Sequence, residues 1–233
     1  MKKLAIATLL IVASKAHATT FNAAADFSLS SNPNGVWSYG YSTTLGGTFI
    51  LDTNSGTMTI NPNFSYWGAN IGPNNTPIVF ENTAATNQQG GGANLDPGQL
   101  AFHPGPNGEI SIVRWISPGA ESISLNTIFT GRDNVNGTTT DVHIFHNGSS
   151  LFDGLVNGFG PGSGPSFATS LAVLQGDTID FAVGIGNNGT YISDTTGLDA
   201  TITVTAVPIP ATIWLFGSAL VGLGVFGRRK KPA

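Results

Sequence analysis

The sequence predicts an all-β fold for residues 19–207, an antiparallel β-sandwich or jelly roll. Three observations support this prediction. Apolar and polar residues alternate along several short segments, as in 178–185, where Ile179, Phe181 and Val183 share one side of the chain. Six Asn-Gly pairs separate such segments, and this dipeptide favours the positive φ angles of tight hairpin turns. No stretch of this range shows the sustained 3.6-residue apolar period of an amphipathic helix.

These patterns place the expected elements along the chain. An early hairpin is predicted around Asn54-Ser55-Gly56, between strands at 49–52 and 57–60. Later strands are predicted at 123–129, 141–146, 178–185 and 201–205, and Asn147-Gly148 is the expected turn after the strand at 141–146. Two Gly-rich segments, 82–98 and 157–166, are predicted to be loops.

The N-terminal segment is typical of a secretory signal. Lys2 and Lys3 precede a ten-residue apolar stretch at 4–13, which is too short to span a bilayer. Ala16 and Ala18 then supply small residues at the two positions that a signal peptidase recognises. Residues 1–18 are therefore predicted to be a signal peptide. It would direct export of the chain by the Sec machinery, and signal peptidase would remove it after Ala18.

The C-terminal segment predicts a membrane helix at 210–227. Residues 211–227 carry no charge, and a basic cluster follows at once, made up of Arg228, Arg229, Lys230 and Lys231. Seventeen helical residues reach about 26 Å, close to the ~30 Å of a hydrocarbon core. Because basic clusters stay on the cytoplasmic side, the rest of the chain is expected outside the cytoplasm.

The end of the chain resembles the PEP-CTERM sorting signal of bacterial exported proteins. The resemblance rests on the sequence Val207, Pro208, Ile209, Pro210, on the hydrophobic segment after it and on the terminal basic cluster. The motif differs at Ile209, where the family has Glu. The resemblance implies that residues 208–233 are a sorting tail processed by exosortase, which is a membrane peptidase or transpeptidase. It also implies an association with extracellular polysaccharide or biofilm at the cell surface or outside the cell.

The central part of the chain carries a second resemblance. The phrases at 32–40, 102–105, 113–115 and 176–181 look like a recurrent module of bacterial exported proteins, a jelly roll of the carbohydrate-binding kind. This resemblance implies a fold and no assigned activity.

Charge and cysteine content exclude several classes of function. Residues 19–207 hold all thirteen acidic residues but only Arg114 and Arg132 as basic ones, a net charge of −11. Such a domain is expected to repel nucleic acid. The chain has no cysteine, which excludes disulfides and thiolate metal sites.

Four aspartates near the end of the domain form a candidate calcium site, namely Asp177, Asp180, Asp194 and Asp199. Carboxylate oxygens suit Ca²⁺, although the spacing differs from the known calcium loop. The alternative is that these residues cap turns and occupy solvated strand positions. The three histidines of the domain, His103, His143 and His146, are predicted to lie on the surface. Positions 143 and 146 are expected to face opposite sides of one strand, where they cannot share a metal ion.

Aromatic residues of the first third form a candidate glycan site: Trp37, Tyr39, Tyr41, Tyr66 and Trp67. Aromatic rings stack on sugar faces. Because 37, 39 and 41 alternate on one strand face, core packing is the alternative. Arg114 is a further candidate because basic residues are rare in this domain, and pairing to an aspartate is its alternative role.

The sequence contains no catalytic motif, so we expect a protein that is not an enzyme. The leading interpretation is an exported surface or matrix protein associated with extracellular polysaccharide. One alternative is a Ca²⁺-dependent carbohydrate-binding module. A second is a polysaccharide hydrolase, for which Glu81, Glu109 and Glu121 are equal candidates. No cofactor is expected beyond this candidate calcium ion.

Overall fold

The computed structural model of the protein describes residues 18–205. Within this range the regular secondary structure consists of β-strands and two three-residue 3-10 turns, η1 (Pro73–Asn75) and η2 (Gly186–Asn188). The expected all-β class is confirmed. No helix within residues 18–205 has the length and apolar composition needed to cross a bilayer.

The two predicted terminal signals fall almost entirely outside the described residues. Ala18 is the first residue of a strand, whereas Ala16, the sorting motif at 207–210, the helix predicted at 210–227 and the basic cluster at 228–231 lie outside the described range. Export and sorting therefore stay predictions.

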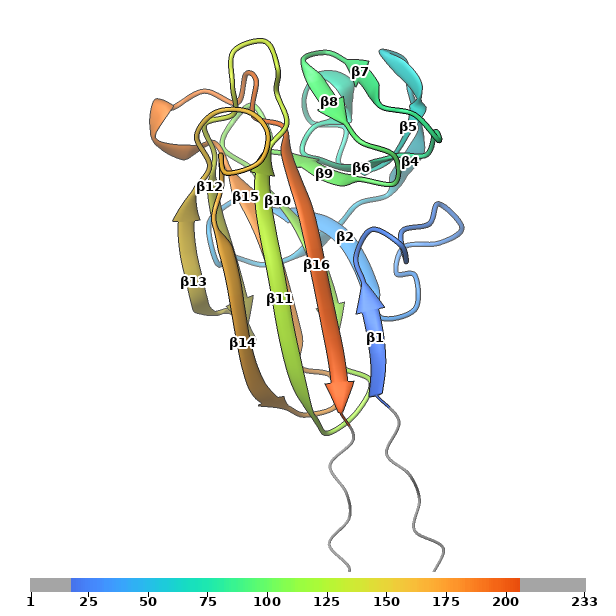
Figure 1. Ribbon diagram of the computed structural model, residues 1–233, viewed down its shortest axis with the longest axis vertical. Coiled ribbons are helices and arrows are strands. Elements are labelled where there is room, and N and C mark those ends of the chain that lie inside the picture. The colour runs from blue at the N-terminus through green and yellow to red at the C-terminus, as the bar shows by residue number, and fades with distance from the viewer. Residues whose placement is uncertain (1–17, 206–233) are drawn as a thin grey trace, which may run out of the picture.

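An eight-stranded sheet forms one layer of the sandwich (Figure 1). Seven of its strands follow one another in space in the order β14 (Ser166–Val173), β11 (Glu121–Gly131), β16 (Thr196–Thr205), β9 (Leu100–His103), β6 (Ile78–Asn82), β5 (Asn61–Gly68) and β4 (Asn54–Met58). The eighth, β1 (Ala18–Asn22), pairs with β16. All of these pairings are antiparallel.

A six-stranded antiparallel sheet forms the other layer. Its spatial order is β13 (Ser149–Leu155), β12 (Asp141–His146), β15 (Thr178–Gly184), β10 (Ile110–Ile116), β2 (Trp37–Ser42) and β3 (Ile50–Leu51). A short separate hairpin joins β7 (Gln88–Gly90) to β8 (Ala93–Leu95).

The main core lies between the two sheets. Because side chains alternate along a strand, each strand sends every second residue inward. The smaller sheet contributes Trp37, Trp115 and Phe181, and the larger sheet contributes Leu125 and Ile202, all of them at most 1% exposed. The alternation predicted for 123–129 and 178–185 is therefore confirmed on the core side.

A second apolar cluster lies on the outer face of the larger sheet. Ile78 and Phe80 on β6 and Ala101 on β9 alternate with core residues and point away from the sandwich. The β7–β8 hairpin covers part of this face and buries Leu95 against it. The same strands are thus covered on both faces, and the hairpin leaves an opening at its edge that is described below.

Two of the predicted elements are wrong in detail. Asn54-Ser55-Gly56 is not a hairpin turn, because it lies within β4, while β3 pairs with β2 in the other sheet. The chain passes from one sheet to the other between Leu51 and Asn54. The predicted loop at 82–98 contains the β7–β8 hairpin, whose turn residues Gly91 and Gly92 have positive φ angles.

The predicted turn at Asn147-Gly148 is confirmed. His146 pairs with Ser149 across a two-residue connection between β12 and β13. Asn147 and Gly148 have φ angles of 51° and 77°, as a tight hairpin turn requires.

The two ends of the described chain lie side by side. β1 pairs with β16 in a register that places Ala18 opposite Thr205. Both ends therefore leave the domain at the same pole, shown at the bottom of Figure 1. The start of β16 and the β7–β8 hairpin lie at the opposite pole.

Candidate ligand-binding site

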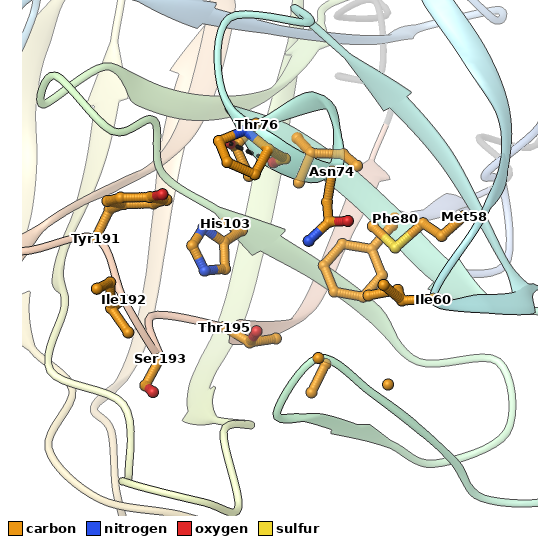
Figure 2. Close-up of a pocket in the computed structure, with 15 residues that line it drawn as sticks. Met58, Ile60, Asn74, Thr76, Phe80, His103, Tyr191, Ile192, Ser193 and Thr195 are labelled. Carbon is orange, nitrogen blue, oxygen red and sulfur yellow. Dashed lines mark hydrogen bonds between the residues drawn. The ribbon is translucent and has the colours of Figure 1, made fainter.

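A cavity of about 190 Å³ opens on the outer face of the larger sheet (Figure 2). Part of its lining comes from β4, β6, β9 and the β7–β8 hairpin, which lie at the pole opposite the chain ends in Figure 1. We call it the apical pocket. Figure 2 shows Met58, Ile60 and Phe80 on one side and Tyr191, Ile192 and Ser193 on the other, with Asn74, His103 and Thr195 between them. The pocket thus combines residues from five segments of the chain, namely 58–60, 73–80, 90–93, 103 and 191–195.

His103 ends β9 and lies between the two sides of the pocket. Its register partner is Ile78 on β6, so its side chain projects from the same face as Phe80. Nδ1 lies 2.9 Å from the carbonyl oxygen of Pro104. Because a carbonyl oxygen only accepts, Nδ1 carries the proton and Nε2 remains an acceptor. Burial lowers the pKa of His103, which keeps the ring uncharged at neutral pH.

Asn74 reaches the pocket from a tight loop between β5 and β6. Asn74 and Asn75 have φ angles of 55° and 65°, and asparagine tolerates this left-handed region better than most residues. The loop is closed by hydrogen bonds from the backbone N–H groups of Ile71 and Gly72 to the Thr76 carbonyl, at 3.1 and 2.8 Å. Figure 2 shows the Asn74 amide pointing toward the pocket. Within the described chain this amide makes no hydrogen bond, so it is available to a ligand.

Tyr191 and Ser193 belong to the loop that leads into β16. The Tyr191 ring stands edge-on to His103, with ring centroids 5.9 Å apart. Ser193 has a φ angle of 66° and its Oγ accepts a hydrogen bond of 2.9 Å from the Asn136 amide. The hydroxyl of Thr138 donates to the Thr195 carbonyl at 2.7 Å. These bonds fix the loop to its neighbour and hold Tyr191 at the rim.

Asp194 holds the same loop from its other side. Its Oδ1 accepts hydrogen bonds of 3.2 Å from the backbone N–H and the hydroxyl of Thr139. Burial raises the pKa of Asp194 to about 7. Nearby, the Gly186 N–H donates to Asp141 at 2.7 Å and the Asn188 amide donates to the Thr139 hydroxyl, so both ends of the η2 segment are anchored.

The pocket lining carries no acidic or basic side chain apart from the uncharged His103. Since an ion loses hydration on entering such a site without gaining a partner, the lining favours a neutral ligand.

The predicted aromatic glycan site is wrong for three of its residues. Trp37, Tyr39 and Trp67 lie in the main core, at 1%, 0% and 8% exposure, so their rings cannot stack on a sugar. For Trp37 and Tyr39 the alternative, core packing, is what is observed, because both lie on the inner face of β2. Tyr41 and Tyr66 are half-buried and lie outside the apical pocket.

Arg114 takes the alternative role, pairing with an aspartate. Its Nε and Nη2 donate to the two carboxylate oxygens of Asp180 at 2.6 and 2.8 Å. The guanidinium also lies 4.2 Å from the ring centre of Phe49. These contacts occupy the polar face of Arg114 within the sheet.

The four candidate calcium ligands are not brought together. Asp177 accepts from the Leu174 N–H at 2.8 Å and contacts His146, Asp180 pairs with Arg114, and Asp194 binds Thr139. Asp199 lies on β16 opposite Ile128. Within residues 18–205 no group of three or more His, Cys, Asp or Glu side chains could hold a metal ion. Asp177 takes the turn-capping role that the alternative predicts, because it accepts a backbone hydrogen bond within its own turn.

His143 departs from the predicted surface position. It is 6% exposed and lies between two carboxylates, with Nε2 2.9 Å from Asp141 and Nδ1 2.5 Å from Asp153. Burial lowers its pKa, but the hydrogen bonds to Asp141 and Asp153 outweigh this effect and raise it overall. His146 contacts a different carboxylate, that of Asp177.

The sequence analysis missed the residues that form the apical pocket. Asn74, His103, Tyr191 and Ser193 are separated in the chain and share no motif. The only local signals were the Asn, Gly and Pro content of 69–77, which indicates a loop, and the phrase at 102–105, which contains His103.

No protein-family model and no curated protein sequence matches this chain. Among solved structures, a family 51 carbohydrate-binding module from Clostridium perfringens GH95, in complex with methyl-galactose, has a TM-score of 0.35 and 12% identity and covers 66% of this chain and 94% of its own. A family 35 module from Paenibacillus barcinonensis has a TM-score of 0.30 and 14% identity. This match covers 81% of the present chain and 99% of that module.

A Clostridium perfringens ZmpB structure that contains a family 51 module with GlcNAc has a TM-score of 0.33 and 13% identity. This match covers 48% of the present chain and spans 23% of that one. At these TM-scores the likenesses carry no argument about function, so any function must be argued from the pocket itself.

Proposed function

We propose that this protein is an exported, non-enzymatic carbohydrate-binding module whose apical pocket takes one neutral sugar residue. The observation that supports the proposal is the uncharged, aromatic and amide-lined apical pocket in an otherwise strongly acidic domain. A sugar has an apolar face and a rim of hydroxyls, and a site for it needs apolar surface together with a few placed polar groups.

The pocket offers these groups in separate positions. The ring of Tyr191 supplies an apolar surface at the rim. The Asn74 amide both donates and accepts, and Nε2 of His103 accepts. The volume of about 190 Å³ is below the ~300–1,000 Å³ of sites for drug-sized ligands. The occupant is therefore a single ring, such as a terminal or side-branch residue of a polysaccharide.

The lining favours binding over hydrolysis. Glycoside hydrolysis generally requires two carboxyl groups on either side of the scissile bond. None of the described residues that line the apical pocket carries a carboxyl group, so it lacks the groups for this chemistry. Calcium is not included in the proposal, because the four candidate aspartates contact different partners.

The terminal segments supply the location in this proposal. The signal-like segment at 1–18 and the PEP-CTERM-like tail at 208–233 would export the domain and retain it at the membrane until exosortase acts. Since Ala18 and Thr205 are paired neighbours, both signals would connect to one pole, and the pocket would face away from the membrane. Recovery of the mature chain in the cytoplasm of the native host would contradict this part of the proposal.

Binding to neutral sugars tests the proposal directly. The purified full-length protein is titrated with glucose, galactose, mannose and their N-acetylated forms, by calorimetry and by NMR. We expect at least one to bind, and Tyr191→Ala to weaken that binding roughly 5- to 30-fold, as expected for the loss of about 1–2 kcal/mol of ring contact.

A matched substitution separates the pocket from the rest of the surface. Phe159 is also exposed, at 47%, and lies outside the pocket, so Phe159→Ala should leave the affinity unchanged. Failure of every neutral sugar to bind, with both variants folded, would overturn the proposal.

A further inference from the structure

The apical pocket is asymmetric, and this asymmetry bears on which sugar it takes. One side is formed by the apolar side chains of Met58, Ile60 and Phe80, which carry no hydrogen-bond donor and no acceptor stronger than the Met58 thioether (Figure 2). Met58 and Phe80 are 5% and 2% exposed and belong to the second apolar cluster. Ile60 is 41% exposed and extends this surface to the rim.

A sugar hydroxyl group fits this side poorly. Any hydroxyl turned toward Met58 and Phe80 would lose its water without finding a partner, which disfavours binding. A methyl group in the same place would remove apolar surface from water on both partners. The apolar side therefore favours a sugar with a methyl-bearing substituent.

The polar groups next to this side match an amide. Nε2 of His103 is an acceptor, since Nδ1 donates to Pro104, and it can receive an amide N–H. The Asn74 side chain can donate to an amide carbonyl. Figure 2 shows Asn74 next to Phe80, and His103 between this apolar side and Tyr191. The two residues thus lie beside the place where the methyl group would pack.

Charge selects between the acetylated and the free amine. An unacetylated amino sugar is a cation at neutral pH, and the lining provides no carboxylate to replace its water. Acetylation removes this charge and adds the methyl group in one step.

We infer that the apical pocket recognises an N-acetylated amino sugar, with the acetyl methyl against Met58, Ile60 and Phe80 and the amide between Asn74 and His103. This inference rests on the proposed function and narrows its ligand class. It assigns the specificity to Ile60 and Asn74, and the general affinity to Tyr191.

The experiment compares matched sugars on the full-length protein. N-acetylglucosamine is titrated beside glucose and glucosamine, and N-acetylgalactosamine beside galactose. The expected result is at least tenfold tighter binding of one N-acetylated sugar than of its two counterparts. In saturation-transfer NMR the acetyl methyl protons should receive more saturation than the ring protons.

Met58 offers a direct probe, because the chain has only two methionines, Met1 and Met58. With ¹³C-methyl methionine, the Met58 signal should shift on adding the N-acetylated sugar. Ile60→Thr places a hydroxyl on the apolar side at an exposed position, and it should reduce the N-acetyl preference to about threefold or less. Ile128→Thr makes the same change at a 49% exposed isoleucine outside the pocket and should preserve the preference.

The outcomes separate this inference from the function on which it rests. Equal binding of glucose and N-acetylglucosamine, or an unchanged preference in Ile60→Thr, would overturn the N-acetyl assignment and leave the neutral-sugar proposal intact. Binding of none of the sugars would overturn both.

Discussion

The carboxyl group of Asp52 is buried at the point where the chain passes from the smaller sheet to the larger one. Asp52 is 1% exposed, and within the described chain neither of its carboxylate oxygens has a hydrogen-bond partner. Its backbone is held by the Tyr39 carbonyl and the Asn32 amide, at 3.0 and 2.9 Å. Burial raises the pKa of Asp52 to about 8, so the folded protein holds this group protonated at neutral pH.

This carboxyl group should make the protein less stable as the pH rises. The folded state keeps the Asp52 proton up to about pH 8, whereas the unfolded chain releases it near pH 4. The free energy of unfolding should therefore decrease as the pH rises from about 4 to about 8. Asp52→Asn should match the wild type near pH 4 and exceed its stability by on the order of 5 kcal/mol at pH 8.5.

Urea denaturation of both proteins across this pH range measures the effect. A constant difference between wild type and Asp52→Asn from pH 4 to pH 8.5 would show that ionisation of Asp52 is not the cause.

At the scale of single elements, the turn between β12 and β13 depends on one glycine. Gly148 has a φ angle of 77° and no atom within 4 Å of the position of an added Cβ. A substitution there meets backbone strain alone. Gly148→Ala should therefore lower the free energy of unfolding by about 1–2 kcal/mol, measured by urea denaturation.

Gly56 provides the control for this prediction. It lies within β4 at an ordinary φ angle, and an added Cβ would be 3.6 Å from the Tyr66 ring. Gly56→Ala should be neutral or slightly stabilising. Equal destabilisation by both substitutions would mean that loss of glycine itself, rather than the turn geometry, sets the cost.

The predictions from sequence succeeded where the signal is local. Ile179, Phe181 and Val183 are buried as their alternation indicated, and Asn147-Gly148 forms its turn because both residues tolerate positive φ angles. The assignment of strands to sheets failed at 49–60. Nothing local distinguishes a strand that pairs back to its neighbour from one that crosses to the other sheet, which depends on distant partners.

The same limit applies to the candidate site. Trp37 and Tyr39 have the composition of a sugar platform, but they alternate on a face that the opposite sheet covers. The pocket instead gathers Asn74, His103 and Tyr191, which pairing between distant strands and the packing of two loops bring together. Residue types alone do not reveal such a convergence.

At the scale of the whole molecule, β1 pairs with the C-terminal half of β16 and covers its edge there. Its register runs from Ala18 opposite Thr205 to Asn22 opposite Thr201, and Phe21 packs 5.9 Å from the Trp115 ring. In the full chain, replacing residues 19–22 by a Gly-Ser sequence should lower the melting temperature. It should also promote concentration-dependent association, because it exposes an open strand edge.

Thermal melting and light scattering at several protein concentrations test this prediction, with the unaltered chain for comparison. A variant that melts like the wild type and stays monomeric would show that β1 adds little beyond its covalent link to the signal segment.

The position of β16 has a mechanical consequence. Thr195 and Ser193 line the pocket and immediately precede this strand, while the strand ends at Thr205, beside the proposed tether. A pull between a held polymer and the membrane would thus travel along β16 from one end to the other. Its ladder with β11 runs from Gly131–Thr196 to Ser122–Thr205, and the hydrogen bonds of such a ladder lie across the strand direction. The force would load these bonds in shear, many at once, rather than peel them one by one.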